Sequence, residues 1–343
     1  RATWLAGIQQ EKARPQTAAL RVLPPLLYGA GHPYAIPFTG SGTEASIASL
    51  TREDLVAFHR DWLQPGKARV VVVGDTTLAR IVPELEERFG DWKTPAGAPT
   101  LPAVADVARP AAPRVFLVDN PGAIQSNVYV GQVVAPTGDA GTIDFDFANG
   151  VLGGEFSSRL NMNLREDKHW AYGSYSGATS AVGPRPWIAS AAVQADKTSE
   201  SIAELGREIA AFAGGTRPVT EAEVARIRAS NTRSLPGAFE TGAAVLGQVA
   251  ADLRFGRPAD YIVRYQARNE AMTVADVTRA ARAIDPRAAT WVVVGDLAKI
   301  EPGVRALAIG EVRVVDADGQ PATRAATPAA PATAPAPAPV PKP

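Results

Sequence analysis

The sequence contains no cysteine, and only two methionines and three histidines among 343 residues. The missing cysteine excludes disulfide scaffolds, thiolate zinc sites, iron–sulfur clusters and cysteine nucleophiles. Lysine plus arginine number 35, as do aspartate plus glutamate, so the net charge is zero and the composition does not favour nucleic acid as a partner. No apolar run approaches the roughly 18 residues that a membrane-spanning helix needs, so we expect no membrane span.

The composition is that of a folded protein of about two domains. Hydrophobic residues make up 46% of the chain and charged residues 20%, which is typical of globular proteins. At about 150 residues per domain, the length suffices for two hydrophobic cores. The sequence starts at Arg1 inside a helix-like segment without methionine, and we interpret it as a fragment or processed product of a longer chain.

Two stretches rich in proline and alanine mark the boundaries, one before residue 114 and one at the end of the sequence. Such a composition buries no core and favours extended, polyproline-like conformations. We therefore expect an α+β region over residues 1–93, a linker over 94–113, a complete α+β domain over 114–317 and a disordered tail over 318–343.

A diverged internal repeat connects the two α+β regions. The stretch LTREDLVAFHRDWLQPGKARVVVVGD ends at Asp75, and AMTVADVTRAARAIDPRAATWVVVGD ends at Asp296. In each copy a threonine, Thr51 or Thr273, stands three residues before an aspartate, which predicts a capped helix start. Each helix then leads through a proline turn into an apolar strand.

The two strands of the repeat, over residues 70–73 and 291–294, are apolar without alternation. This pattern predicts strands well inside a sheet and covered on at least one face. In the first copy, the apolar residues after Leu78 follow helical spacing, and Leu55 and His59 lie on a similar apolar face one element earlier. Helices packed on one face of a sheet, in two tandem copies, form an α+β architecture.

The second domain follows the pattern β-β-α-α-β-β, then a helical run and a closing strand. Its expected strands cover residues 114–119, 125–134, 172–179 and 187–194. Its expected helices cover residues 143–152, 157–165, 198–213, 220–233 and 237–255.

The three histidines do not form a metal site by their spacing. His32, His59 and His169 never stand three or four residues apart, and a zinc site needs at least three nitrogen, sulfur or oxygen ligands brought together. We interpret His59 as a packing residue on an apolar helix face, and His32 as a loop residue.

Other catalytic and ligand-binding motifs are absent or incomplete. The pair Gly153-Gly154 lacks the Lys-Ser/Thr of a P-loop and the third glycine of a dinucleotide fingerprint, so we expect it to allow a bend or a close backbone approach. No G-x-S-x-G elbow is present. The neighbouring carboxylates Glu166 and Asp167 would not face each other on a helix.

Arg165 and Tyr172 bracket a helix-to-strand corner in LREDKHWAYGSYSG. A fixed cation and a neutral hydroxyl donor suit the stabilisation of a carbonyl oxyanion or the grip on a peptide backbone. An ordinary explanation is also open, in which Arg165 is an exposed helix-end arginine favoured by the helix dipole and Tyr172 is a strand residue.

The stretch GGEFSSRLNMNLREDKHWAYGSYSG, together with the tandem repeat ending in VVVVGD and VVVGD, resembles the insulinase/pitrilysin family of zinc metallopeptidases. The resemblance implies tandem α/β sandwich domains, each a mainly antiparallel sheet packed against helices. The family's zinc motif, H-x-x-E-H, is absent from the sequence. Where the family's third zinc ligand would fall, before Pro15, residues 5–8 offer no carboxylate.

The resemblance further implies that this chain is the zinc-free portion of such an enzyme. Arg165 and Tyr172 match the family's Arg and Tyr seven residues apart, which hold substrate and stabilise the tetrahedral intermediate. Zn²⁺ is then expected in the complete enzyme and not in this chain, which alone would be inactive. The partners would be a peptide substrate and a zinc-bearing half with H-x-x-E-H, on the same polypeptide or on another subunit.

The cellular location and an alternative function follow less directly from the resemblance. A cysteine-free chain with an Ala/Pro-rich tail, similar to bacterial members of the family, suits the periplasm. A non-catalytic assembly or core subunit with the same fold is the alternative function. Such a subunit would keep the architecture and lose the demands of catalysis on Arg165 and Tyr172.

Overall fold

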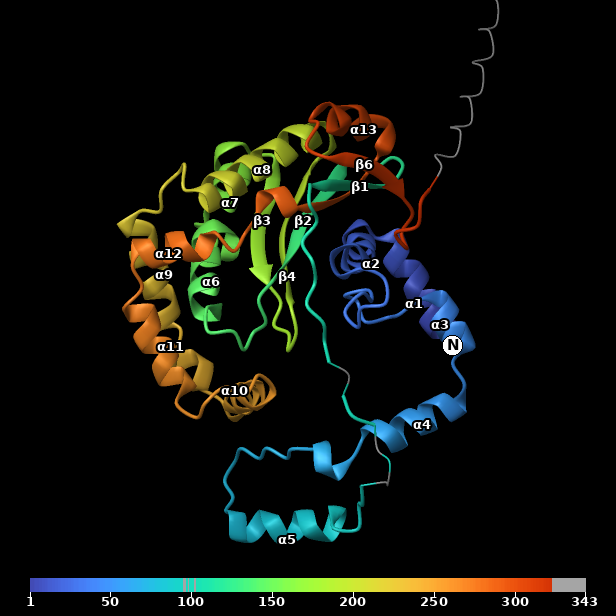
Figure 1. Ribbon diagram of the computed structural model, residues 1–343, viewed down its shortest axis with the longest axis vertical. Helices are drawn as coiled ribbons and strands as arrows, with labels where there is room; N and C mark the ends of the chain where they lie inside the picture. The colour runs from blue at the N-terminus through green and yellow to red at the C-terminus, as the bar shows by residue number, and fades with distance from the viewer. Residues whose placement is uncertain (95–96, 98, 102, 323–343) are drawn as a thin grey trace, which may run out of the picture.

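The computed structural model describes residues 1–94, 97, 99–101 and 103–322, and a six-stranded sheet forms its centre (Figure 1). The strand order is β3-β4-β2-β5-β1-β6. Strand β1 pairs in parallel with β5 and β6, and the other neighbours are antiparallel, so the mainly antiparallel α+β sheet is confirmed. The strands are β1 (Arg114–Asp119), β2 (Gln125–Val134), β3 (Ala171–Ala178), β4 (Arg185–Gln194), β5 (Thr290–Gly295) and β6 (Glu311–Val315).

Helices surround this sheet and also form the N-terminal region. The α-helices are α1 (Ala2–Ala13), α2 (Pro15–Tyr28), α3 (Glu44–Ser49), α4 (Arg52–Trp62), α5 (Leu78–Phe89), α6 (Thr142–Asn149), α7 (Arg159–Asn161), α8 (Thr198–Gly214), α9 (Glu221–Arg233), α10 (Gly242–Arg254), α11 (Tyr261–Glu270), α12 (Val274–Ala281) and α13 (Leu297–Ala306). Two π-helical segments, η2 (Gly150–Gly154) and η3 (Met162–Asp167), flank α7. Short 3₁₀ turns cover Pro65–Lys67, Ala195–Lys197, Pro236–Phe239 and Pro286–Ala288.

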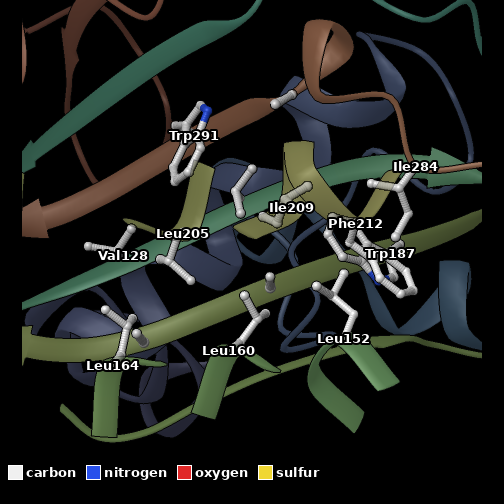
Figure 2. Packing of buried hydrophobic residues seen from close by; sticks show 14 of the residues in the cluster. Val128, Leu152, Leu160, Leu164, Trp187, Leu205, Ile209, Phe212, Ile284 and Trp291 are labelled. Carbon is white, nitrogen blue, oxygen red and sulfur yellow. The ribbon is translucent and has the colours of Figure 1, made fainter. Parts of the chain in front are cut away.

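The central strands are buried on both faces, which explains why they are apolar without alternation. In β5, Trp291 and Val293 enter the larger core, whereas Val292 and Val294 enter the smaller core on the other face. The larger core also receives Trp187 from β4 and the leucines of the broken helix η2–α7–η3 (Figure 2). At roughly 1.5–3 kcal/mol for each large apolar side chain removed from water, this core is the main stabilising feature of the domain.

The second face of the sheet is covered by α2, from the N-terminal region (Figure 1). Val22, Leu23 and Leu27 of α2 pack against the outward side chains of β1 and β5. The buried Arg21 joins α2 to the end of the domain, because its guanidinium pairs with Glu11 at 2.8 Å and with Asp318 at 3.2 Å. Helix α2 and the sheet of the second domain therefore share one core.

The C-terminal boundary lies later than the sequence predicts. Residues 318–322 form a turn and return along β6, with a bridge between Val315 and Pro321 and a hydrogen bond from Ala322 N–H to Val314 C=O. The expected disorder over 318–322 is therefore wrong. Residues 323–343, the rest of the expected tail, lie outside the described residues.

The segment from α4 to α5 differs most from expectation. Residues 70–73 belong to no strand, and Val70, Val72 and Val73 are exposed. No residue of α4 or α5 is buried, and His59 is exposed instead of packed. The expected strand fails because, among the described residues, no neighbouring strand lies beside it. Figure 1 shows this segment set apart from the sheet.

Candidate functional site

The motif that the sequence analysis singled out forms a broken helix that lies against the edge strand β3. The chain runs through α6, the π-helical η2, the short α7 and the π-helical η3 before it turns into β3. π-Helical turns are rare in proteins and are frequent at functional sites. The single helices expected over residues 143–152 and 157–165 are thus interrupted by wider turns.

Gly153 allows the closest contact between this helix and the strand. A Cβ atom at position 153 would lie 2.3 Å from Ser176 Oγ and 2.6 Å from the Ser176 backbone nitrogen. Only glycine fits at such distances. The expectation that the Gly153-Gly154 pair allows a close backbone approach is confirmed for Gly153.

Two buried asparagines cover the backbone of the edge strand. Asn161 Oδ1 accepts a hydrogen bond of 3.1 Å from Ser174 N–H, and Asn149 Nδ2 donates one of 2.8 Å to Ser176 C=O. Strand β3 pairs with β4 alone, so its outer edge is the side on which another strand could add. The asparagines occupy two of these edge groups, which opposes the addition of a peptide as a further strand.

Arg159 fastens the broken helix to α9. Its guanidinium donates to both oxygens of Glu223 at 2.7 and 2.8 Å, and to the carbonyls of Arg217 and Pro218 at 2.8 and 2.9 Å. Burial alone would raise the pKa of Glu223, but hydrogen bonds from Arg159 and Thr220 lower it to about 2. A bidentate, buried pair of this kind fixes geometry as well as charge.

The corner between η3 and β3 is held by hydrogen bonds of its own. His169 has a positive φ of 58°, a conformation that histidine rarely adopts, and its Nδ1 lies 3.0 Å from Arg165 C=O. Trp170 N–H donates to Leu164 C=O, and Gln194 N–H donates to Trp170 C=O, both at 3.0 Å. The corner that Arg165 and Tyr172 bracket is therefore well defined.

The structure places Arg165 on η3 and Tyr172 at the start of β3, both open to solvent. The Tyr172 side chain is 85% exposed, and that of Arg165 is 40% exposed. The Arg165 guanidinium lies over the Phe156 ring at 4.7 Å and pairs with Glu166 at 3.2 Å. Within the described part of the chain no hydrogen bond joins Arg165 to Tyr172, so both keep donors available to a bound molecule.

Sequence reasoning missed the exposed aromatic side chain beside Arg165. Phe156 is 55% exposed although it is apolar, and its ring supports the guanidinium by a cation–π contact. The signal lay in the motif itself, where an aromatic residue follows Gly153-Gly154-Glu155 directly, but an isolated phenylalanine does not indicate its partner.

The described residues do not fit a zinc site. Across residues 1–94 and 103–322 no three His, Asp or Glu side chains gather closely enough to hold a metal ion. His32, in a loop as expected, stacks on Tyr28, and its Nε2 lies 3.0 Å from Ala105 C=O. Nor does any helix in the described part of the chain combine the length and apolar character needed to cross a membrane.

Comparison with known proteins gives the family. The model of the family described as "Peptidase M16 inactive domain" matches residues 49–231, more than half of the chain. The chain therefore belongs to the M16 peptidase family, in its inactive domain, which confirms the insulinase-type resemblance.

One curated relative and two solved structures illustrate the likeness. The Bacillus subtilis protein named "Uncharacterized zinc protease YmxG" is 28% identical over 135 residues, 39% of this chain and 31% of that protein. The match thus spans about a third of the relative's length. The structure of a peptidase M16 inactive domain from Pseudomonas fluorescens has a TM-score of 0.76 at 24% identity, over 86% of this chain and 69% of that chain.

The first half of the periplasmic protease PqqL from Escherichia coli has a TM-score of 0.64 at 13% identity, over 92% of this chain and 71% of that chain. At these identities both structures show a shared fold. The chain is thus an inactive M16 domain of the kind found in proteins named zinc proteases.

Proposed function

We propose that this chain is the non-zinc half of an M16 metalloendopeptidase, forms one wall of the peptide chamber, and presents Arg165 and Tyr172 to the substrate. One observation carries the proposal. The motif's buried polar residues Asn149, Arg159 and Asn161 are bound within the fold, whereas Arg165 and Tyr172 point hydrogen-bond donors into solvent from a rigid corner.

The chemistry follows from the two side chains. The Arg165 guanidinium is a fixed cation with several donors, and it suits a peptide carbonyl or the oxygen that gains charge during hydrolysis. The Tyr172 hydroxyl adds a neutral donor without a competing charge. Because asparagines cover part of the β3 edge, the peptide would be held by side chains, with the reaction itself performed at a zinc site carried elsewhere.

The partner is a zinc-bearing half with H-x-x-E-H, on the same polypeptide or on another subunit, and Zn²⁺ belongs to that half. A relative and a structural neighbour support this proposal, because the relative YmxG is named a zinc protease and the neighbour PqqL a periplasmic protease. PqqL also supports a periplasmic location. Cell fractionation of the source organism tests the location, and recovery of the protein with cytoplasmic markers would contradict it.

Kinetics of the assembled enzyme test the proposal. We expect Arg165→Ala and Tyr172→Phe each to lower kcat by about 100-fold or more on peptide substrates, as for the loss of an oxyanion donor. Arg313→Ala serves as the matched control, since Arg313 is likewise exposed and paired with a neighbouring glutamate, Glu311, on the distant strand β6.

The alternative is a non-catalytic assembly subunit with the same fold. In that case both variants would leave kcat and KM unchanged and alter stability alone. Circular dichroism melting of the same variants, read together with the kinetics, separates the two functions. The peptidase role requires that the variants lose turnover while their Tm stays unchanged.

A further inference from the structure

A recess of about 400 Å³ opens into the larger core beside Trp291 of β5. The apolar walls of this Trp291 recess include Ile202 and Ile209 of α8, and Leu307 and Ile309 after α13. Figure 2 shows Ile209 and Trp291 on this side of the core. Native cores are packed almost without voids, whereas a volume of this size is ordinary for a small-molecule site. The recess is therefore a candidate for a ligand.

Gly206 keeps the recess open on the side of α8. It lies in the interior of this helix, where glycine is destabilising relative to alanine. A Cβ atom at position 206 would lie 3.7 Å from Trp291 Cζ2 and 4.0 Å from Trp291 Cη2, which is ordinary van der Waals contact. The packing of the helix therefore does not require glycine here. What glycine provides is free space beside the indole ring.

The indole of Trp291 supplies a hydrogen-bond donor that the fold does not use. Trp291 is 5% exposed, and its Nε1–H donates to none of the described residues, whereas Nε1–H of Trp187 in the same core donates to Asn149 at 2.8 Å. A buried indole N–H usually has a partner. Because Cζ2 and Nε1 are bonded to the same ring carbon, the free donor lies next to the edge that Gly206 contacts.

The charges at the rim of the recess are already paired. Among the described residues that line it, Arg207 alone is charged, and its guanidinium contacts Glu204 and, at 3.3 Å, Glu208. Glu208 also pairs with Arg217 at 2.8 Å. A charged ligand would lose its hydration in an apolar site without gaining a free counter-charge, which is unfavourable. The recess therefore suits an uncharged ligand.

We propose that the Trp291 recess binds a small, uncharged apolar molecule that carries one hydrogen-bond acceptor. The acceptor lies on Trp291 Nε1–H, and the apolar body lies between α8 and the chain after α13. Its apolar surface supplies the van der Waals contacts that the core lacks there. Strands β4 and β2 separate β5 from β3, so the site does not involve Arg165 or Tyr172 and does not depend on the function proposed above.

Equilibrium dialysis of the 343-residue chain against benzophenone tests the proposal, with diphenylmethane as the matched probe. The two probes have similar shapes, but only the ketone carries an acceptor. We expect saturable binding of benzophenone, about 3- to 10-fold tighter than that of diphenylmethane, which is the gain from one net hydrogen bond. Trp291→Phe should remove this preference, because it removes the donor and keeps an aromatic ring.

Substitutions at Gly206 test the place of binding. Gly206→Leu should fill the recess, weaken benzophenone binding at least about 10-fold and raise the Tm of the free chain. Gly206→Ala, whose methyl group makes ordinary contacts, is the milder variant and should weaken binding in the same direction. Gly247→Leu puts the same side chain into open space on α10 and is the matched control, which should bind benzophenone as the unchanged chain does.

Photolabelling gives an independent location. Irradiated benzophenone forms a bond to a neighbouring C–H group, so mass spectrometry should find the label on α8, on β5 or on residues 307–309. Label elsewhere, no saturable binding, equal affinity for the two probes, or unchanged binding by Gly206→Leu would overturn the proposal. A dimer of the chain that Gly206→Leu dissociates would also overturn it, because a second copy would then occupy the recess.

Discussion

The buried pair between Arg159 and Glu223 offers a quantitative test of how the broken helix is held. Replacing Arg159 by methionine keeps the length of the side chain and removes every donor. Glu223 then loses two hydrogen bonds, and the carbonyls of Arg217 and Pro218 lose one each. Breaking one partner of a buried pair costs about 3–5 kcal/mol, and because Glu223 keeps some contact with water we expect about 3 kcal/mol.

The same pair makes stability depend on pH. The folded-state pKa of Glu223 is about 2, against an ordinary value of 4.5. At about 1.4 kcal/mol per pH unit the difference of about 2.5 pH units corresponds to at most about 3.5 kcal/mol, which solvent screening lowers to about 2 kcal/mol. Because the pKa is depressed, this contribution is present above pH 4.5 and is lost as the pH falls towards 2.

Urea unfolding at neutral pH and at pH 3 measures both effects. Arg159→Met should lower the free energy of unfolding at neutral pH. Both Arg159→Met and Glu223→Gln should reduce the loss of that free energy between neutral pH and pH 3. Arg313→Ala, which breaks an exposed pair, should change stability by less than about 1 kcal/mol. A cost below about 1 kcal/mol for Arg159→Met, or an unchanged acid dependence, would refute the assignment of Arg159 as the anchor.

Three further substitutions test other contacts. Gly153→Ala should destabilise the chain by about 1–3 kcal/mol in thermal unfolding because the new methyl group overlaps the edge strand, whereas Gly247→Ala, in open space on α10, should be neutral or slightly stabilising. Asn161→Ala should cost about 1–3 kcal/mol, since the Ser174 N–H loses its acceptor, and light scattering should show more aggregation through the uncovered edge. Asp318→Ala should lower the Tm by loosening Arg21 and Lys12, and an unchanged Tm would show that the C-terminal turn is not an anchor.

Much of the second domain could be predicted because its local signals agree with its surroundings. The strands expected over residues 114–119 and 125–134 have those bounds in the structure, and the helix expected over residues 220–233 is α9, which begins at a capping box on Thr220. The apolar, non-alternating stretch over 291–294 correctly indicated a strand well inside a sheet and covered on at least one face, and the structure buries every residue of it. Here sequence pattern and tertiary context favour the same state.

The expectations that were wrong share one physical cause, because the burial of a residue depends on the elements that pack beside it. Residues 70–73 have the sequence of a buried strand, but a strand requires adjacent strands, and the described chain provides none there. His59 is exposed for the same reason, because its helix face lacks the layer that would cover it. The tail boundary was misplaced because the ion pairs of Asp318 join residues about 300 positions apart, beyond the reach of local composition.

The candidate site could be predicted in part. The spacing of Arg165 and Tyr172 was visible in the sequence, and their exposure on a rigid corner agrees with a role in binding. The covering of the β3 edge by Asn149 and Asn161 was not visible, since it depends on π-helical turns that shift side chains away from the ordinary helical spacing.

We propose that this chain holds the peptide while zinc acts from the other half. The most direct measurement is peptide hydrolysis by the purified chain alone and after assembly with its H-x-x-E-H partner, with zinc content determined in both samples. We expect no activity and no stoichiometric zinc in the chain alone, and activity in the assembly that Arg165→Ala and Tyr172→Phe together abolish. Hydrolysis by the chain alone, or full activity of an assembly that carries both substitutions, would contradict this role of the chain.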